Sequence, residues 1–284
     1  MNREQRNLAI FVVATLASTW ILGFLIPLNG LNPYTMPGLV LFLIAGSAPS
    51  WVGVLMVLFT YDRERRRDFW RRCFSFRQIR LRWWAFIILA FPVIYAVLIA
   101  VDLALGGAMP GMVNLKAFIA QPWVLPLALV MSFFSGPFSE EFGWRGYALE
   151  PMMRRFGPML GAAILGFIWG IWHLAWFFMP QTWHGQIGFG FNGFWNFMLY
   201  SIGLSLIMAW VFAKTKRSIL SGLMLHLTSN FTGNLIYPYT DRILLMRMVV
   251  VLVLGLVLGV LMGRETTRSL AATGTAGEAA PMGS

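Results

Sequence analysis

Charged side chains are scarce in this chain of 284 residues: only 12% are Asp, Glu, Lys or Arg, whereas 58% are hydrophobic. So little polar surface cannot coat a soluble domain, and the composition therefore excludes a soluble globular protein. Cysteine occurs once, at Cys73, which excludes a disulfide within one chain. No internal repeat is visible, so the inverted-repeat pattern of many transporters is missing.

Long apolar runs are what the chain has in place of charge. They predict an all-α fold, a polytopic bundle of about eight transmembrane helices, because lipid leaves no hydrogen-bond partner for open backbone. We expect the spans at 8–28, 37–60, 83–106, 123–145, 159–179, 193–213, 218–237 and 243–262. A single membrane domain is predicted over 1–263, and the small, polar residues of 264–284 predict a disordered cytoplasmic tail.

The net charge of +11 gathers in alternate connections. The connection 61–82, "YDRERRRDFWRRCFSFRQIRLR", carries nine arginines, whereas the connection 28–37 has no charge. By the positive-inside rule, this predicts that both termini are cytoplasmic. Aromatic residues alternate with the arginines, a pattern also found in nucleic-acid binding. We favour a segment lying on anionic lipid headgroups and predict no nucleic-acid partner.

Two adjacent carboxylates and an arginine interrupt the fourth span, in the stretch "SEEFGWRGYALE". Each ion costs several kcal/mol in hydrocarbon, so the stretch requires an explanation. Glu141 and Arg145 stand four residues apart, share a helix face and are predicted to pair. Glu140 lies about 100° around the helix from Glu141 and is left unpaired. An unpaired carboxylate in a span is a candidate functional group.

The next span brings a histidine to the same depth. Glu140 lies 156 − 140 = 16 residues before the turn at 156–157, and His173 lies 173 − 157 = 16 residues after it. In an antiparallel helical hairpin, equal rise per residue puts both side chains at one level. Trp169, four residues before His173, is expected to pack beneath the imidazole.

The seventh span carries His226 and Asn230, again four residues apart. His226 lies nine residues beyond the basic Arg217, about 13 Å of helix from the cytoplasmic boundary. The sequence therefore predicts a polar site between the fourth, fifth and seventh helices, reached from the cytoplasmic leaflet. The alternative for a single His or Asn is a hydrogen bond to a neighbouring helix. His184 and Asp102 fall near the outer interface, where no special role is expected.

Three motifs in this order resemble the CPBP family of intramembrane proteases, named for CAAX protease and bacteriocin-processing and also called Abi. The similarity covers about 130–240, and a tryptophan stands where the family usually has phenylalanine. The residues that carry it are Glu140, Glu141 and Arg145, then Trp169 and His173, then His226 and Asn230.

The resemblance, to the prokaryotic branch, implies an intramembrane endopeptidase of a prokaryotic cytoplasmic membrane. Its substrate would be a membrane-associated protein or peptide, cut near its membrane-proximal end. Glu140 would take a proton from water, with His173 holding that water. His226 and Asn230 would stabilise the oxyanion. Glu141, Arg145 and Trp169 would orient the helices or bind the carboxyl end of the substrate.

Other chemistries and functions stay open. Glu140, His173 and His226 form an adequate zinc set, but Asn230 is a poor zinc ligand and no HExxH motif is present. We therefore favour hydrolysis with no cofactor. A non-proteolytic membrane scaffold or bacteriocin-immunity protein of the same fold would not need Glu140. A transporter would need polar groups through both leaflets, whereas here they gather at one depth.

Overall fold

The computed structural model describes residues 2–278, with side chains described as far as Glu265. These residues form helices and no strand, which confirms the all-α fold. The α-helices are α1 Arg3–Leu28, α2 Gly38–Gly46, α3 Ala48–Thr60, α4 Arg63–Phe74, α5 Leu81–Ala104, α6 Val113–Ala120, α7 Leu125–Ser135, α8 Pro137–Gly143, α9 Leu149–Phe156, α10 Pro158–Trp172, α11 Trp183–Ile187, α12 Asn196–Lys214, α13 Ile219–Ile236 and α14 Asp241–Glu278.

The predicted spans are helical, and they differ from the expectation in three places. Six helical segments of the described chain are long and apolar enough to cross a membrane, and a seventh is added if α2 and α3, bent by 51°, count as one span. The fourth predicted span extends through α7, α8 and α9 as one segment over 122–156. Helix α13, at the seventh predicted span, is not among the six because its polar residues, such as His226, Asn230 and Asn234, lower its mean hydropathy. The protein is an integral membrane protein.

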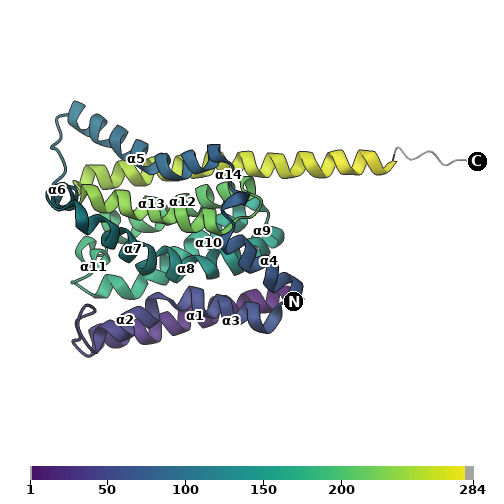
Figure 1. The fold of residues 1–284 in the computed structure, drawn as a ribbon, viewed down its shortest axis with the longest axis horizontal. Coiled ribbons are helices and arrows are strands. Elements are labelled where there is room, and N and C mark those ends of the chain that lie inside the picture. Colours follow the sequence, from purple (N-terminus) through teal and green to yellow (C-terminus); the bar gives the residue numbers. More distant parts are fainter. Residues whose placement is uncertain (1, 279–284) are drawn as a thin grey trace, which may run out of the picture.

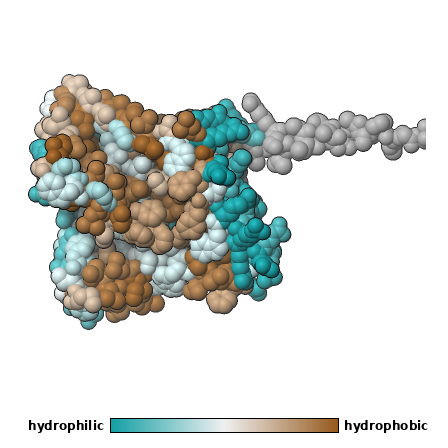
Figure 2. All heavy atoms as spheres, viewed as in Figure 1, coloured by the Kyte–Doolittle hydropathy of each residue, from teal (hydrophilic) through white to brown (hydrophobic). Residues whose placement is uncertain are grey.

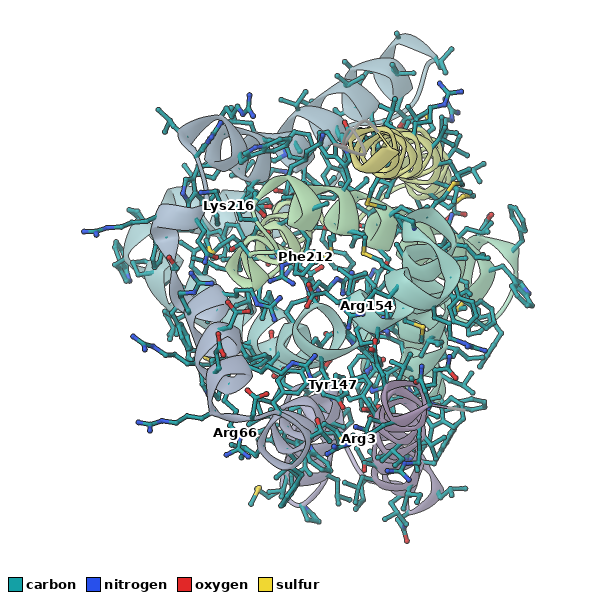
Figure 3. The ribbon with its side chains drawn as sticks, turned by 90° about the vertical axis from the view of Figure 1, so that its right-hand side faces the viewer. Arg3, Arg66, Tyr147, Arg154, Phe212 and Lys216 are labelled. Carbon is teal, nitrogen blue, oxygen red and sulfur yellow. The ribbon has the colours of Figure 1, made fainter. Side chains whose placement is uncertain are left out.

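Helices run along the long axis of the bundle, and different elements lie at its two ends (Figure 1). Helix α4 and the N-terminus lie at one end, and α6 and α11 lie at the other. Hydrophilic residues gather at the first end, as Figure 2 shows. Figure 3 looks onto this end, where Arg3, Arg66, Arg154 and Lys216 come from four separate segments. We call it the basic end.

Ion pairs join three segments at the basic end. Arg72 of α4 is buried and pairs with Asp68 at 2.9 Å and with Glu150 of α9 at 3.1 Å. Glu150 also accepts from Arg217, which precedes α13, at 2.8 Å. Phe69 is buried on the same helix. Helix α4 therefore packs one apolar and paired face against the bundle and leaves Arg63, Arg67 and Arg71 exposed, and the contact with headgroups stays a prediction.

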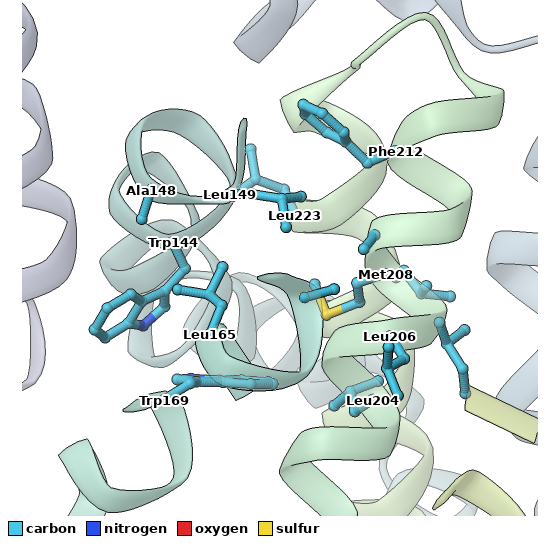
Figure 4. Packing of buried hydrophobic residues seen from close by; sticks show 14 of the residues in the cluster. Trp144, Ala148, Leu149, Leu165, Trp169, Leu204, Leu206, Met208, Phe212 and Leu223 are labelled. Atoms are coloured by element: carbon cyan, nitrogen blue, oxygen red, sulfur yellow. The ribbon is translucent and has the colours of Figure 1, made fainter. Parts of the chain in front are cut away.

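The centre of the bundle is formed by α10, α12 and α14. Gly203 of α12 and Gly255 of α14 meet so closely that a Cβ on Gly255 would lie 2.4 Å from the carbonyl oxygen of Gly203. Small residues at such crossings let two helix backbones approach each other in a membrane. Figure 4 shows the apolar cluster beside α12, with Trp144 and Leu165 on one side and Phe212 on the other.

The backbone of 264–278 continues α14. No proline interrupts the chain between Asp241 and Pro281. The disordered tail expected over 264–284 stays a prediction. Residues 279–284 of the predicted tail lie outside the described residues. The single-domain division at 263 stays a prediction.

Candidate active site

The carboxylates of the fourth predicted span are positioned by a break in the helix. Helix α7 ends at Ser135, and α8 begins at Pro137, the residue that best starts a helix because it needs no backbone donor. Gly136 stands at the break. A Cβ on Gly136 would lie 3.1 Å from Nδ2 of Asn230 and 3.7 Å from Nε2 of His226, so glycine lets α13 approach.

A π-helical segment, Trp144–Ala148, comes directly after α8. Such segments insert an extra residue into a helical turn and thereby rotate the next turns about the helix axis. Arg145 lies on this segment and remains within reach of Glu141, four residues earlier.

Glu141 is fully buried and contacts two nitrogen-bearing side chains, those of Arg145 and His226. Its Oε1 accepts from Nη1 of Arg145 at 3.1 Å and lies 2.7 Å from Nδ1 of His226 on α13. The Arg145 guanidinium, also fully buried, sits 4.4 Å from the centre of the Trp169 ring. The predicted pair of Glu141 and Arg145 is thus present, and its unexpected third member is His226, which ties α8 to α13.

Glu140 faces the other way, toward a cavity. Its Oε2 accepts from the indole Nε1–H of Trp169 at 2.5 Å. His173, one turn beyond Trp169, has Nδ1 2.9 Å from the backbone oxygen of Trp169. A carbonyl oxygen only accepts, so Nδ1 carries the hydrogen and Nε2 of a neutral His173 is an acceptor. Nε2 is therefore available to a water molecule.

One cavity of about 700 Å³ joins these groups. Among the residues that line it are five predicted site residues: Glu140, Trp169, His173, His226 and Asn230. Glu140, His173 and His226 are each less than a tenth exposed. Three segments that are far apart in the sequence therefore bring a carboxylate, two imidazoles and an amide to one hollow.

Two side chains make contacts beyond those expected of them. Trp169 packs beside His173, with ring centres 6.2 Å apart, and its N–H also binds Glu140. His184 lies on α11, at the end of the bundle away from the basic end. The connection that carries it folds back into the bundle, and its ring lies 4.9 Å from that of His173. Burial lowers the pKa of His184 well below its usual value, so its ring is neutral.

Further residues of the cavity carried no signal in the sequence. Tyr200 of α12 and Ser229 of α13 line it, with their hydroxyl oxygens 2.7 Å apart. A lone tyrosine and a lone serine in apolar helices resemble ordinary packing residues. Asp102 is buried and pairs with Arg242 at 3.2 Å, and it does not line the cavity.

The zinc alternative can be tested against the same geometry. Within the described residues, no three His, Cys, Asp or Glu side chains are grouped so that they could hold a metal ion. Nδ1 of His226 and Nδ1 of His173 are engaged by protein oxygens, which leaves each Nε2 free, as in histidines that ligate a metal. What the described residues lack is a grouping of three such ligands around one point.

Replacing Arg145 by alanine is expected to lower stability by about 3–5 kcal/mol, because it leaves the charge of Glu141 buried with one partner fewer. The measurement is the thermal unfolding midpoint of the purified protein in detergent. Arg67→Ala, an exposed arginine of α4, is the matched control and should leave the midpoint unchanged. Equal midpoints for the two variants would contradict the role given to the buried pair.

Comparisons with known proteins match the part of the chain that holds this site. A family profile, described as type II CAAX prenyl endopeptidase Rce1-like, matches residues 121–232, a stretch that includes all seven predicted site residues. The chain is also 24% identical over 235 residues to CAAX prenyl protease 2 of Methanococcus maripaludis, which covers 81% of this chain and 85% of that protein. These matches agree with the resemblance that the three motifs carry: over residues 121–232 the chain is similar to the Rce1-like CAAX prenyl endopeptidases, a family of proteases.

Proposed function

We propose that this protein is an intramembrane endopeptidase that cuts a membrane-associated protein or peptide with a water molecule activated by Glu140. The observation that carries the proposal is the convergence of Glu140, His173 and the pair His226 and Asn230 on one cavity. A carboxylate, an acceptor imidazole and two candidate donors are the groups that peptide hydrolysis needs.

In this proposal, Glu140 and His173 bind and activate the water. A water between Nε2 of His173 and the Glu140 carboxylate donates one hydrogen to each, so its lone pair points toward the substrate. Glu140 takes a proton as the water oxygen attacks the carbonyl carbon. The same proton then goes to the departing amide nitrogen, which leaves as an amine. Trp169 holds the carboxylate through Oε2 and leaves Oε1 for this transfer.

In this proposal, His226 and Asn230 stabilise the negative charge that forms on the carbonyl oxygen of the substrate. Because Glu141 accepts from Nδ1 of His226, Nε2 carries a hydrogen only when the ring is an imidazolium. Nε2–H of His226 and the Nδ2 amide of Asn230 both lie beside Gly136, where they would face one carbonyl oxygen. Glu141, Arg145 and Trp169 accordingly orient these groups.

The surroundings of the cavity support a membrane-associated substrate. Phe42, Leu43 and Gly46 of α2 line it on one side, and Leu43 is 55% exposed on the lipid-facing surface. Ser135 and Gly136 line it at the break between α7 and α8. An apolar anchor in the bilayer could therefore remain in lipid while the attached peptide enters the cavity.

The cavity points away from the basic end. Its lining includes Tyr34, Asn114, Gln186 and Tyr237, all from the end where α6 and α11 lie (Figure 1). None of its described lining residues comes from 61–82, 150–158 or 214–218. Entry from the cytoplasmic leaflet was expected from depth alone. With cytoplasmic basic connections, we propose entry from the opposite face, or sideways from lipid.

Glu140→Gln is expected to reduce hydrolysis at least about a hundredfold, because the amide cannot accept the proton. The measurement is cleavage of a farnesylated CaaX peptide by the protein in liposomes, together with a comparison of peptide termini in host membranes. Glu64→Gln, an exposed glutamate of α4, is the control. If Glu140→Gln cleaves normally, the non-proteolytic scaffold or immunity protein becomes the better interpretation.

Hydrolysis is expected to continue in the presence of a strong zinc chelator, because the proposed steps use side chains alone. The assay is the same peptide cleavage, after dialysis against the chelator, with and without added zinc. Loss of activity that zinc restores would overturn the metal-free mechanism.

The orientation of the protein in the membrane can be tested by labelling single cysteines. In a Cys73→Ser background, a membrane-impermeant maleimide applied to intact cells should label Gln186→Cys and leave Arg67→Cys unlabelled until the cells are opened. Both positions are exposed, one at the mouth of the cavity and one at the basic end. Labelling in the reverse order would place the mouth of the cavity in the cytoplasm.

A further inference from the structure

A second charged group lines the cavity at a distance from Glu140. Arg247 of α14 is only 5% exposed, and it is the one arginine or lysine among the described residues of the cavity wall. Helix α14 begins at the end where α6 and α11 lie (Figure 1). His184, which also lines this region, is neutral. Arg247 therefore supplies the positive charge at this end of the cavity.

The partners of Arg247 are aromatic. Its Nη1 lies 3.3 Å from the hydroxyl oxygen of Tyr95, and its guanidinium carbon lies 4.1 Å from the centre of the Tyr200 ring and 5.7 Å from those of Trp183 and Tyr239. No ion pair joins it to a carboxylate of the described residues, and its Nε has no hydrogen-bond partner among them.

This lack of a carboxylate sets Arg247 apart from the other buried arginines. Arg72 is paired with Asp68 and Glu150, and Arg145 is paired with Glu141. An unpaired buried cation is costly, and aromatic rings offset only part of that cost. A guanidinium that lines a cavity and has a donor to spare is suited to bind an anion from outside the chain.

The position of Arg247 relative to the oxyanion donors can be measured along α13. The Tyr95 hydroxyl that contacts Arg247 lies 3.1 Å from the point where a Cβ on Gly233 would stand. Gly233 is seven residues beyond His226 on the same helix, about 10 Å of rise. Tyr200, beneath the guanidinium, reaches Ser229 between these two levels. An extended peptide of three residues also spans about 10 Å.

We propose that Arg247 binds the C-terminal carboxylate of the peptide substrate and thereby sets the bond that is cut, about three residues from that end. The inference rests on the proposed function and names the part of the substrate that the cavity recognises. With the carboxylate at Arg247, an extended chain brings the carbonyl to be attacked to the level of His226 and Glu140. Tyr95 and Tyr239, whose hydroxyl groups both lie near Gly233, are in place to donate to the second carboxylate oxygen.

The test uses one probe in two forms, a farnesylated CaaX peptide as free acid and as C-terminal amide. With the full-length protein in nanodiscs, we expect kcat/KM to be at least about tenfold higher for the acid, since only the acid offers Arg247 a charge. Arg247→Gln should bring the acid-to-amide ratio to about one, and Arg247→Lys should keep part of the preference. Arg264→Gln, the same change of charge on an exposed arginine of α14, should leave the ratio as it is.

The cleavage position gives an independent readout. A peptide lengthened by one residue at its C-terminus should be cut one bond further along, so that mass spectrometry finds a released fragment of unchanged length. A cut that stays at the original bond overturns the inference, as does an acid-to-amide ratio near one in the wild type or one unchanged in Arg247→Gln.

A binding measurement distinguishes a failure of this inference from a failure of the proposed function. Anisotropy of fluorescent acid and amide probes is measured with Glu140→Gln, which binds without cutting. If the wild type cleaves nothing, the proposed function fails. Preferential binding of the acid that disappears in Arg247→Gln would then still support the carboxylate site. Equal binding of both probes would overturn it.

Discussion

The charge of Glu141, buried in the middle of the bundle, is the constraint on which the site depends. A carboxylate at zero exposure must be paired, and its two partners come from different elements: Arg145 from the π-helical segment and His226 from α13. The pairing holds the helix with the proposed base against the helix with the proposed oxyanion donors. The charge of Glu141 is thus matched by the guanidinium of Arg145, which lowers the cost of holding both inside a hydrocarbon surrounding.

The convergence of Glu140 and His173 on one cavity could be predicted from the sequence, because helical rise is constant. Counting from the turn at 156–157 put Glu140 and His173 at one level, and both line one cavity. Rotation about the helix axis could not be predicted in the same way. The contact of Trp169 with Glu140 depends on a break at Gly136 and on how far α10 turns before it, and no periodicity reports either.

Connections were the weakest part of the prediction, for a physical reason. The apolar runs of the spans must be helical in lipid, so their existence follows from composition. A polar connection has no such requirement, and the one that carries His184 folds inward and forms part of the cavity wall. The direction in which the cavity opens is decided by these connections. Reasoning from spans alone predicted access from the cytoplasmic leaflet, whereas the lining of the cavity includes no described residue of the basic connections. The role of Arg247 could not be predicted from the spans either, because in the sequence it is one arginine near the beginning of an apolar helix.

The closed basic end has a consequence for the order of events during turnover. Buried Arg72 and its ion pairs lie there, and no described residue from the basic connections lines the cavity. Under the function proposed above, a short C-terminal fragment would leave through the mouth by which the substrate entered. That fragment would lie toward the mouth, while the longer product would reach back past Glu140. The short fragment would therefore depart first, and the membrane-held product would withdraw after it.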